Sequence, residues 1–158
     1  ASRSSFYHYF AEIDVFVDEL LALHWTICLE FNSAGQKTCK KLIPDLYHLL
    51  SQHPVPLQFS RQLFLNRHIP RYNYLFVKTY ELSSKTFVLD LFAEHLELQQ
   101  PHSELNHLFL TLGEAWYSRL DPQDLSEGTI QHHAEDILRD LLNFIDTGVY
   151  SKLLKVPQ

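Results

Sequence analysis

The amino-acid sequence predicts an all-α fold, a single-domain bundle of five to seven helices with long N-terminal and C-terminal helices. Three observations favour it. Apolar residues recur at steps of three and four along most of the chain, there are only four Gly residues, and most of the seven Pro residues mark breaks between periodic runs. Because 158 residues suffice to enclose one core, we expect residues 1–158 to form one helical domain.

The first predicted helix spans about residues 5–32, since no Gly or Pro interrupts its apolar stripe. Asn32, Ser33 and Gly35 are expected to end this helix. A second helical run follows, in which Pro44 marks a kink or a restart. Its apolar positions are Leu42, Leu46, Leu49 and Leu50.

The middle of the chain is divided by the sequence His53-Pro-Val-Pro, which predicts a clear break. A short helix over residues 57–66 is expected to close before Pro70. Residues 71–98 are compatible with helix or with a hairpin turning at Ser83-Ser84, because they are rich in aromatic and β-branched residues. We favour helix, since the acids of residues 86–98 fall on one side of a helical projection.

The last two helices are separated by Asp121-Pro122. The final one is predicted to begin near Asp124 or Ser126, because Asp124 and Glu127 have the spacing of a capping box. Gly148 is expected to end it. Its predicted inner face is Ile130, Ala134, Ile137, Leu141, Phe144 and Ile145.

The start of this final helix also resembles the recognition helix of the LuxR-type helix-turn-helix family. The residues that carry the resemblance are Leu125, Ser126, Thr129, Ile130, His133, Ile137, Leu138 and Leu141. The resemblance implies a DNA-reading transcriptional regulator. Residues 121–124, however, lengthen a turn that is short in that family, and the acids Glu127, Glu135 and Asp140 would repel phosphates. We therefore favour an ordinary capped amphipathic helix.

Two His residues, His24 and His95, are predicted to point into the core, because apolar neighbours flank both at helical spacing. A buried imidazole needs a hydrogen-bond partner and tends to lose its proton. Each is therefore either an ordinary core residue or a ligand-binding residue for haem, a metal or a small molecule. His107 and His132 fall on outer helix faces, so we predict no metal centre and no cofactor.

Basic residues are concentrated in residues 33–80, although the whole chain has a net charge of −6. The densest mixture of basic and aromatic side chains predicts a surface for a protein or peptide partner. This surface consists of Arg67, His68, Arg71, Tyr72 and Tyr74. The alternative is that these charges are neutralised within the fold. The acidic overall balance argues against a nucleic-acid partner.

The sequence contains no motif of a common enzyme class. Four scattered Gly residues cannot form a phosphate-binding loop, and no nucleophile-elbow or zinc-protease motif occurs. Cys28 follows His24 by four residues, but a thiol on a buried stripe is usually inert. With Cys28 and Cys39 alone and no apolar run of about 20 residues, we expect a soluble, cytoplasmic protein with free thiols.

The predicted function is therefore that of a non-enzymatic helical binding or regulatory module, which binds a protein partner or a second copy of itself. The first alternative is a ligand-binding sensor or an oxygenase-type helical protein that holds haem, a metal or a small molecule near His24 or His95. The second alternative is a transcriptional regulator.

Overall fold

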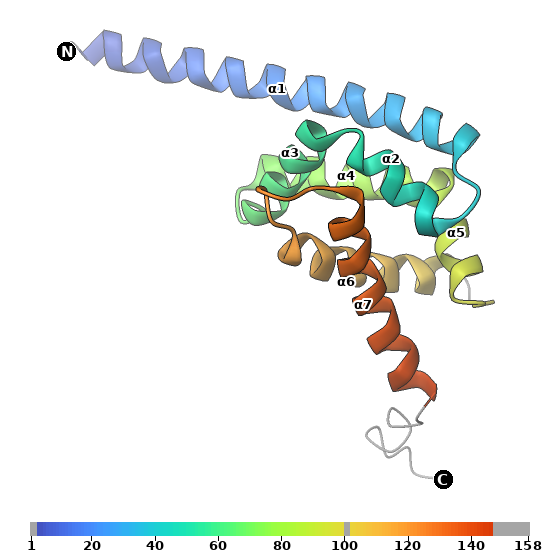
Figure 1. Ribbon diagram of the computed structural model, residues 1–158. Helices are drawn as coiled ribbons and strands as arrows, with labels where there is room; N and C mark the ends of the chain where they lie inside the picture. Colours follow the sequence, from blue (N-terminus) through green and yellow to red (C-terminus); the bar gives the residue numbers. More distant parts are fainter. Residues whose placement is uncertain (1–2, 100–101, 147–158) are drawn as a thin grey trace.

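The computed structural model describes residues 3–99 and 102–146, and this part of the chain is all-α (Figure 1). Seven α-helices over these residues, with no strand among them, confirm the predicted fold class and helix number. In chain order the elements are α1 (Arg3–Thr38), the π-helical turn η1 (Leu42–Leu46), α2 (Tyr47–Ser51), α3 (Pro54–Leu65), α4 (Pro70–Thr86), α5 (Val88–His95), α6 (His102–Arg119) and α7 (Glu127–Asp146).

Helix α1 is longer than predicted, because it continues through the residues expected to end it. Asn32 donates from Nδ2 to the carbonyl of Cys28 at 2.9 Å, and its Oδ1 accepts from the Thr86 hydroxyl at 2.9 Å. Gly35 lies against the ring of Phe87, where a Cβ would overlap the ring. Both residues thus serve the contact between α1 and the α4–α5 junction, so the predicted terminator was wrong.

The turn after α1 leads into the kink predicted at Pro44. Ile43 has extended backbone angles, with φ −116° and ψ 125°, so the helical run restarts at Pro44. Asp45 stabilises the turn, because its Oδ2 accepts the backbone N–H groups of Lys40 and Lys41 at 2.8 and 2.9 Å. These two hydrogen bonds lower the pKa of the Asp45 carboxyl.

The region that was ambiguous between helix and hairpin is helical. It forms α4 and α5, which are separated at Phe87, where the backbone has φ −146° and ψ −25°. The break turns the Phe87 side chain into the core, where it is 8% exposed and packs on Gly35. Helix α3 begins at Pro54, earlier than predicted, because Pro is well tolerated in the first turn of a helix.

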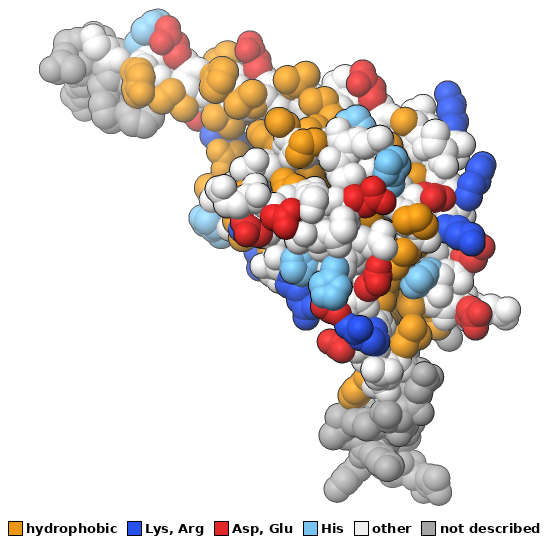
Figure 2. Space-filling view, in the orientation of Figure 1, with side chains coloured by type: hydrophobic (Ala, Val, Ile, Leu, Met, Phe, Trp, Pro, Cys, Tyr) orange, Lys and Arg blue, Asp and Glu red, His pale blue; other side chains and the backbone are white. Residues whose placement is uncertain are grey.

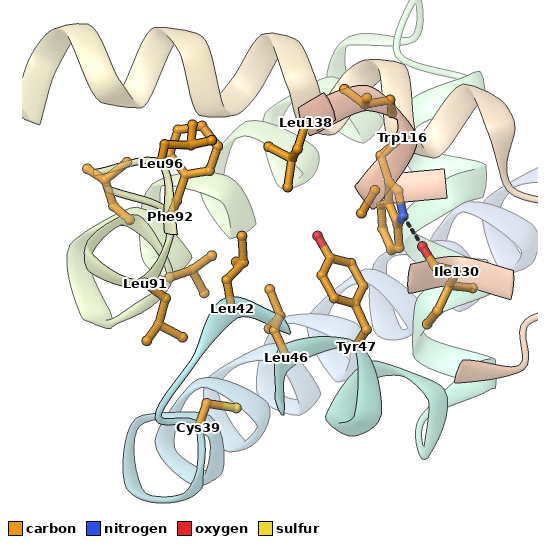
Figure 3. Close-up of a cluster of buried hydrophobic side chains, with 14 of the residues drawn as sticks. Cys39, Leu42, Leu46, Tyr47, Leu91, Phe92, Leu96, Trp116, Ile130 and Leu138 are labelled. Carbon is orange, nitrogen blue, oxygen red and sulfur yellow. Dashed lines mark hydrogen bonds between the residues drawn. The ribbon is translucent and has the colours of Figure 1, made fainter. Parts of the chain in front are cut away.

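The main hydrophobic cluster brings together side chains from η1, α2, α5, α6 and α7 (Figure 3). Ile130 of α7 is its most deeply buried member, with 0% exposure. Trp116 of α6 donates from its indole Nε1 to the Ile130 carbonyl at 2.8 Å. A second cluster lies between α3 and α4 and consists of Leu63, Phe64, Leu75 and Phe76. Tyr117 packs against both clusters.

The burial of side chains in α7 confirms most of the inner face that was predicted for this helix. Ile130, Ala134 and Ile137 are buried, and Leu141 is half-buried. Phe144, predicted on the same face, is 37% exposed. The reason is visible in Figure 1, where the last turns of α7 extend away from the other helices. Gly148 lies outside the described residues.

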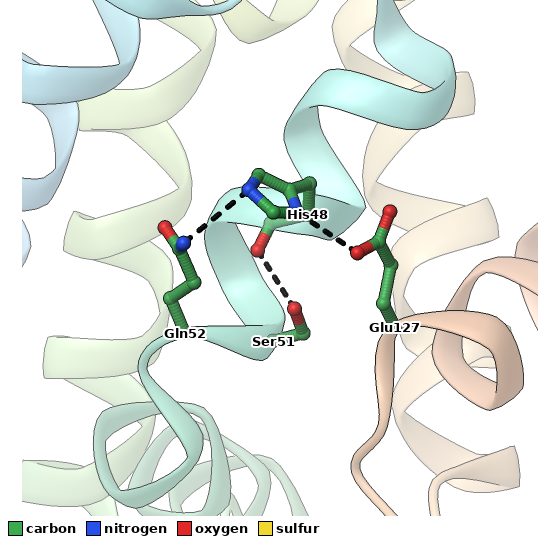
Figure 4. Close-up of polar contacts among 4 residues, drawn as sticks. All are labelled: His48, Ser51, Gln52 and Glu127. Carbon is green, nitrogen blue, oxygen red and sulfur yellow. Dashed lines mark hydrogen bonds and ion pairs between the residues drawn. The ribbon is translucent and has the colours of Figure 1, made fainter.

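The start of α7 differs in detail from the predicted capping box. Asp124 accepts hydrogen bonds from the Ser126 hydroxyl at 2.6 Å and the Thr129 hydroxyl at 2.7 Å. Glu127 does not complete a reciprocal box. Its Oε2 instead accepts from Nδ1 of His48 in α2 at 2.8 Å (Figure 4). The carboxylate therefore connects α7 to α2. No helix over the described residues has the length and hydropathy to cross a membrane.

Candidate ligand pocket beside His24

A partly open pocket of about 540 Å³ lies among the helices, and every helix from α1 to α7 contributes to its lining. Its walls are mostly apolar and are unusually rich in aromatic rings. The rings come from Phe31, Tyr47, Tyr80, Phe92, Phe109, Trp116 and Tyr117. A cavity of this size falls in the range of small-molecule sites, which is roughly 300 to 1,000 Å³.

Polar side chains interrupt the pocket wall at several points, and His24 is at the centre of one patch of them. His24 is 3% exposed, and a hydrogen bond of 3.1 Å joins its Nε2 to Oγ of Ser60 in α3. The thiol of Cys28, one turn further along α1, lies 3.5 Å from the same nitrogen. The imidazole also packs on Phe59, with 4.5 Å between ring centroids. These contacts hold the ring in one orientation at the pocket wall.

Burial keeps both ionisable groups of this patch neutral at physiological pH. Desolvation lowers the pKa of His24 to about 4 and raises the pKa of the Cys28 thiol to about 11. Burial also raises the pKa of Tyr117, although a hydrogen bond with Ser60 acts in the opposite direction. The patch thus offers neutral hydrogen-bonding groups, and neither an imidazolium nor a thiolate.

The described residues that line the pocket include no Lys or Arg, and Glu30 is the single carboxylate among them. Glu30 is exposed, so it lies at the edge of the pocket rather than within it. An anionic ligand would therefore find no countercharge inside, and desolvating it would be costly. The pocket chemistry fits a neutral molecule.

The prediction that His24 is buried is confirmed, but the same prediction for His95 is wrong. His95 is the last residue of α5 and is exposed. It borders a shallow hollow whose far side is formed by polar residues of α7, including Glu135 and Arg139. The imidazole therefore lies near α7 but stays in contact with solvent.

No cluster of three or more His, Cys, Asp or Glu side chains able to hold a metal ion occurs within residues 3–99 and 102–146. His107 and His132 are exposed, as their helical positions predict. His132 lies 3.2 Å from Asp136 on the outer face of α7.

The predicted partner-binding surface lies at the turn between α3 and α4, and part of its charge is engaged by the protein itself. Arg71 contacts Asp14 and Asp18 of α1 at 3.3 and 3.5 Å. The guanidinium of Arg67 donates to the Phe64 carbonyl at 2.9 Å and lies over the Phe64 ring. His68 is exposed, Tyr72 is half-buried and Tyr74 is 68% exposed. The exposed part is therefore aromatic as much as basic.

Sequence reasoning identified His24 but missed Ser60 and Tyr117. The pairing of His24 with Ser60 joins residues 36 positions apart, and it depends on how α1 lies across α3. The one local signal was the four-residue spacing of His24 and Cys28. Nothing in the sequence around Ser60 distinguishes it from a surface serine.

Comparison with models of known protein families, with curated proteins and with solved structures finds no match for this chain. The fold and the pocket therefore define only a class, an all-α protein with an aromatic-walled pocket.

Proposed function

We propose that this protein is a non-enzymatic helical binding module that holds a neutral, largely apolar small molecule in the pocket beside His24. The observation that carries this proposal is the aromatic-walled space of about 540 Å³ with a patch of neutral polar side chains at His24. Apolar walls supply affinity through burial, and a few convergent polar groups fix the orientation of a ligand.

The expected ligand carries at least one ring and one uncharged hydrogen-bonding group. Ring-rich walls favour offset or edge-to-face contacts with an aromatic ligand. Ser60 and the neutral His24 can exchange hydrogen bonds with a hydroxyl or carbonyl group. A carboxylate or phosphate is disfavoured, because no cation faces the pocket among the described residues.

A hydrolytic role for Ser60 and His24 is less well supported. A general base works best when its pKa is near the working pH, and burial lowers that of His24 to about 4. Catalytic serine–histidine pairs also use a third group that orients the imidazole. The contacts of His24 are with Ser60, Cys28 and Phe59, none of which is an acid.

The proposal is tested with three probes of similar shape, naphthalene, 1-naphthol and 1-naphthoic acid at neutral pH. Calorimetric titration is expected to show saturable binding of naphthalene and 1-naphthol, with much weaker binding of the carboxylate. The change Ser60→Ala should weaken the binding of 1-naphthol by roughly tenfold, because it removes one hydrogen-bonding group. The affinity for naphthalene should stay the same.

The matched control is Ser118→Ala, which removes an exposed hydroxyl that donates to the Ala115 carbonyl away from the pocket. This change should affect none of the three titrations. The proposal fails if no probe saturates, or if 1-naphthoic acid binds as tightly as 1-naphthol.

A protein partner at the α3–α4 turn is the second candidate function. It is favoured by the exposure of Tyr74, Arg67 and His68 in and after the α3–α4 turn. Charge reversal by Arg67→Glu tests this candidate better than a change at Arg71, because Arg71 also holds α1 through Asp14 and Asp18. Arg67→Glu should reduce recovery of an acidic partner in pull-down, whereas Arg119→Glu, at an exposed position of α6, should not. Equal recovery with both variants would exclude this surface.

A further inference from the structure

Helix α1 has 36 residues and is about 54 Å long, so it is far longer than the other helices. Its N-terminal part extends beyond the rest of the molecule (Figure 1). Its middle packs on α3 and α4, where Leu21 and Trp25 join the second hydrophobic cluster. A second face of α1 is largely exposed toward its N-terminal end, although Ile27 at its other end lines the pocket.

That second face carries a regular apolar seam. Its members alternate at steps of four and three, which is the a/d spacing of a coiled-coil helix. The seam consists of Tyr9, Ile13, Phe16, Leu20, Leu23 and Ile27. Phe16 is 59% exposed and Leu23 is 56% exposed, while Leu20 and Ile27 are half-buried. Figure 2 shows hydrophobic side chains following α1 toward its N-terminal end.

The two edges of the seam differ in chemistry. Val17 and His24 flank it on the side that faces the body, where His24 is buried against Ser60. Glu12, Glu19 and Glu30 flank it on the other side, and all three are exposed. Glu12 also pairs with His8, whose Nε2 lies 2.8 Å from its carboxylate, and the exposed Thr26 lies on the same side. The accessible edge of the seam therefore carries an excess of acidic groups.

We infer that the α1 seam, defined by these six residues, docks an amphipathic helix of another chain that carries Lys or Arg along one edge. A basic edge would lie against Glu12, Glu19 and Glu30 while its apolar stripe covers Phe16 and Leu23. A second copy fits less well. In antiparallel pairing, Glu12 of one copy faces Glu19 of the other, and like charges oppose each other.

The test uses two designed peptides of about three heptads, with Leu and Ile at the a and d positions and either Lys or Glu at all flanking positions. Fluorescence anisotropy with the whole chain should show saturable binding of the Lys peptide and roughly tenfold weaker binding of the Glu peptide. The double change Phe16→Ser and Leu23→Ser should abolish binding of the Lys peptide. The double change Glu12→Lys and Glu19→Lys should reverse the preference between the peptides.

The control is Val15→Ser, because Val15 is 58% exposed but lies on a different face of α1. This variant should bind the Lys peptide as the unchanged chain does, and circular dichroism should show that every variant keeps its helix content. Equal affinity for both peptides, no binding, or full binding after the seam substitutions would each overturn the inference. So would a dimer of the chain, seen by sedimentation, that Phe16→Ser dissociates.

Discussion

His24 shows how one buried side chain connects pocket chemistry to stability. Its pKa is about 4 in the folded protein, against an ordinary value near 6.5, because burial disfavours the imidazolium. Below pH 6.5 the unfolded chain binds a proton at this site that the folded chain does not bind. Folding stability is therefore lost as the pH falls from about 6.5 toward 4, by at most about 3 kcal/mol.

This pH dependence is measured by urea unfolding between pH 7.5 and 4.5. In that range His24→Gln should show a shallower loss of stability than the unchanged chain, because glutamine does not titrate. His107→Gln, at an exposed position, is the matched control and should follow the unchanged chain. Parallel curves for all three proteins would contradict the assignment to His24.

Gly113 in α6 is the second residue whose role depends on a close contact. A Cβ at this position would overlap the hydroxyl of Tyr80, whose ring lines the pocket. Although Ala is the better helix former, Gly113→Ala should destabilise the fold by about 1–3 kcal/mol, because Tyr80 must move. Urea unfolding at neutral pH measures this.

The control for Gly113 is Gly128→Ala in the first turn of α7, where a Cβ meets no atom within 4 Å. This change should be neutral or stabilising by up to about 1 kcal/mol. If both substitutions stabilise the protein, Tyr80 does not need the space at Gly113.

At the level of elements, the start of α7 depends on Asp124. Its carboxylate accepts hydrogen bonds from Ser126 and Thr129, and these bonds lower its pKa. Asp124→Ala should lower the melting temperature at neutral pH by a few degrees, and Asp124→Asn by less, because the amide keeps one acceptor. The contribution is present above the ordinary carboxyl pKa and lost as the pH falls through the lowered one.

Thermal unfolding at neutral pH and again at strongly acidic pH measures this effect. The difference between Asp124→Ala and the unchanged chain should shrink in acid, where the carboxylate is protonated. Asp140→Ala, which removes an exposed acid further along α7, serves as control. A difference that persists unchanged in acid would exclude the carboxylate as the cause.

The helices also show which features of the fold could be predicted from local sequence. Periodicity predicted α1, α6 and α7 and placed Ile130, Ala134 and Ile137 inside, because a long amphipathic pattern constrains a helix along its whole length. The predicted ends of the helices were less accurate than their positions. Gly35 is a typical terminator in isolation, yet it lies within α1, where Phe87 packs on it and leaves no room for a Cβ. Such a contact between distant residues leaves no mark in local sequence.

For the molecule as a whole, Ile130 is the residue on which the packing of α7 depends most. It has 0% exposure, and its carbonyl accepts the Trp116 indole N–H. Ile130→Ala should reduce the free energy of unfolding by about 2–5 kcal/mol, since it leaves a cavity in the main cluster. Val55→Ala, at a side chain that is 75% exposed, should change it by no more than about 0.5 kcal/mol. Similar urea midpoints for the two variants would contradict this placement of the core.

By itself the sequence determined that this protein is all-α, where most of its helices lie and that His24 is buried, since helical periodicity is a local property. Only the tertiary structure decided which side chains meet. In the folded protein His95 is exposed, His24 pairs with Ser60 and Arg71 contacts α1. The helices also form an aromatic-walled pocket. The physical reason is that a repeat along one helix fixes the direction of a side chain, whereas its surroundings depend on helices distant in the chain.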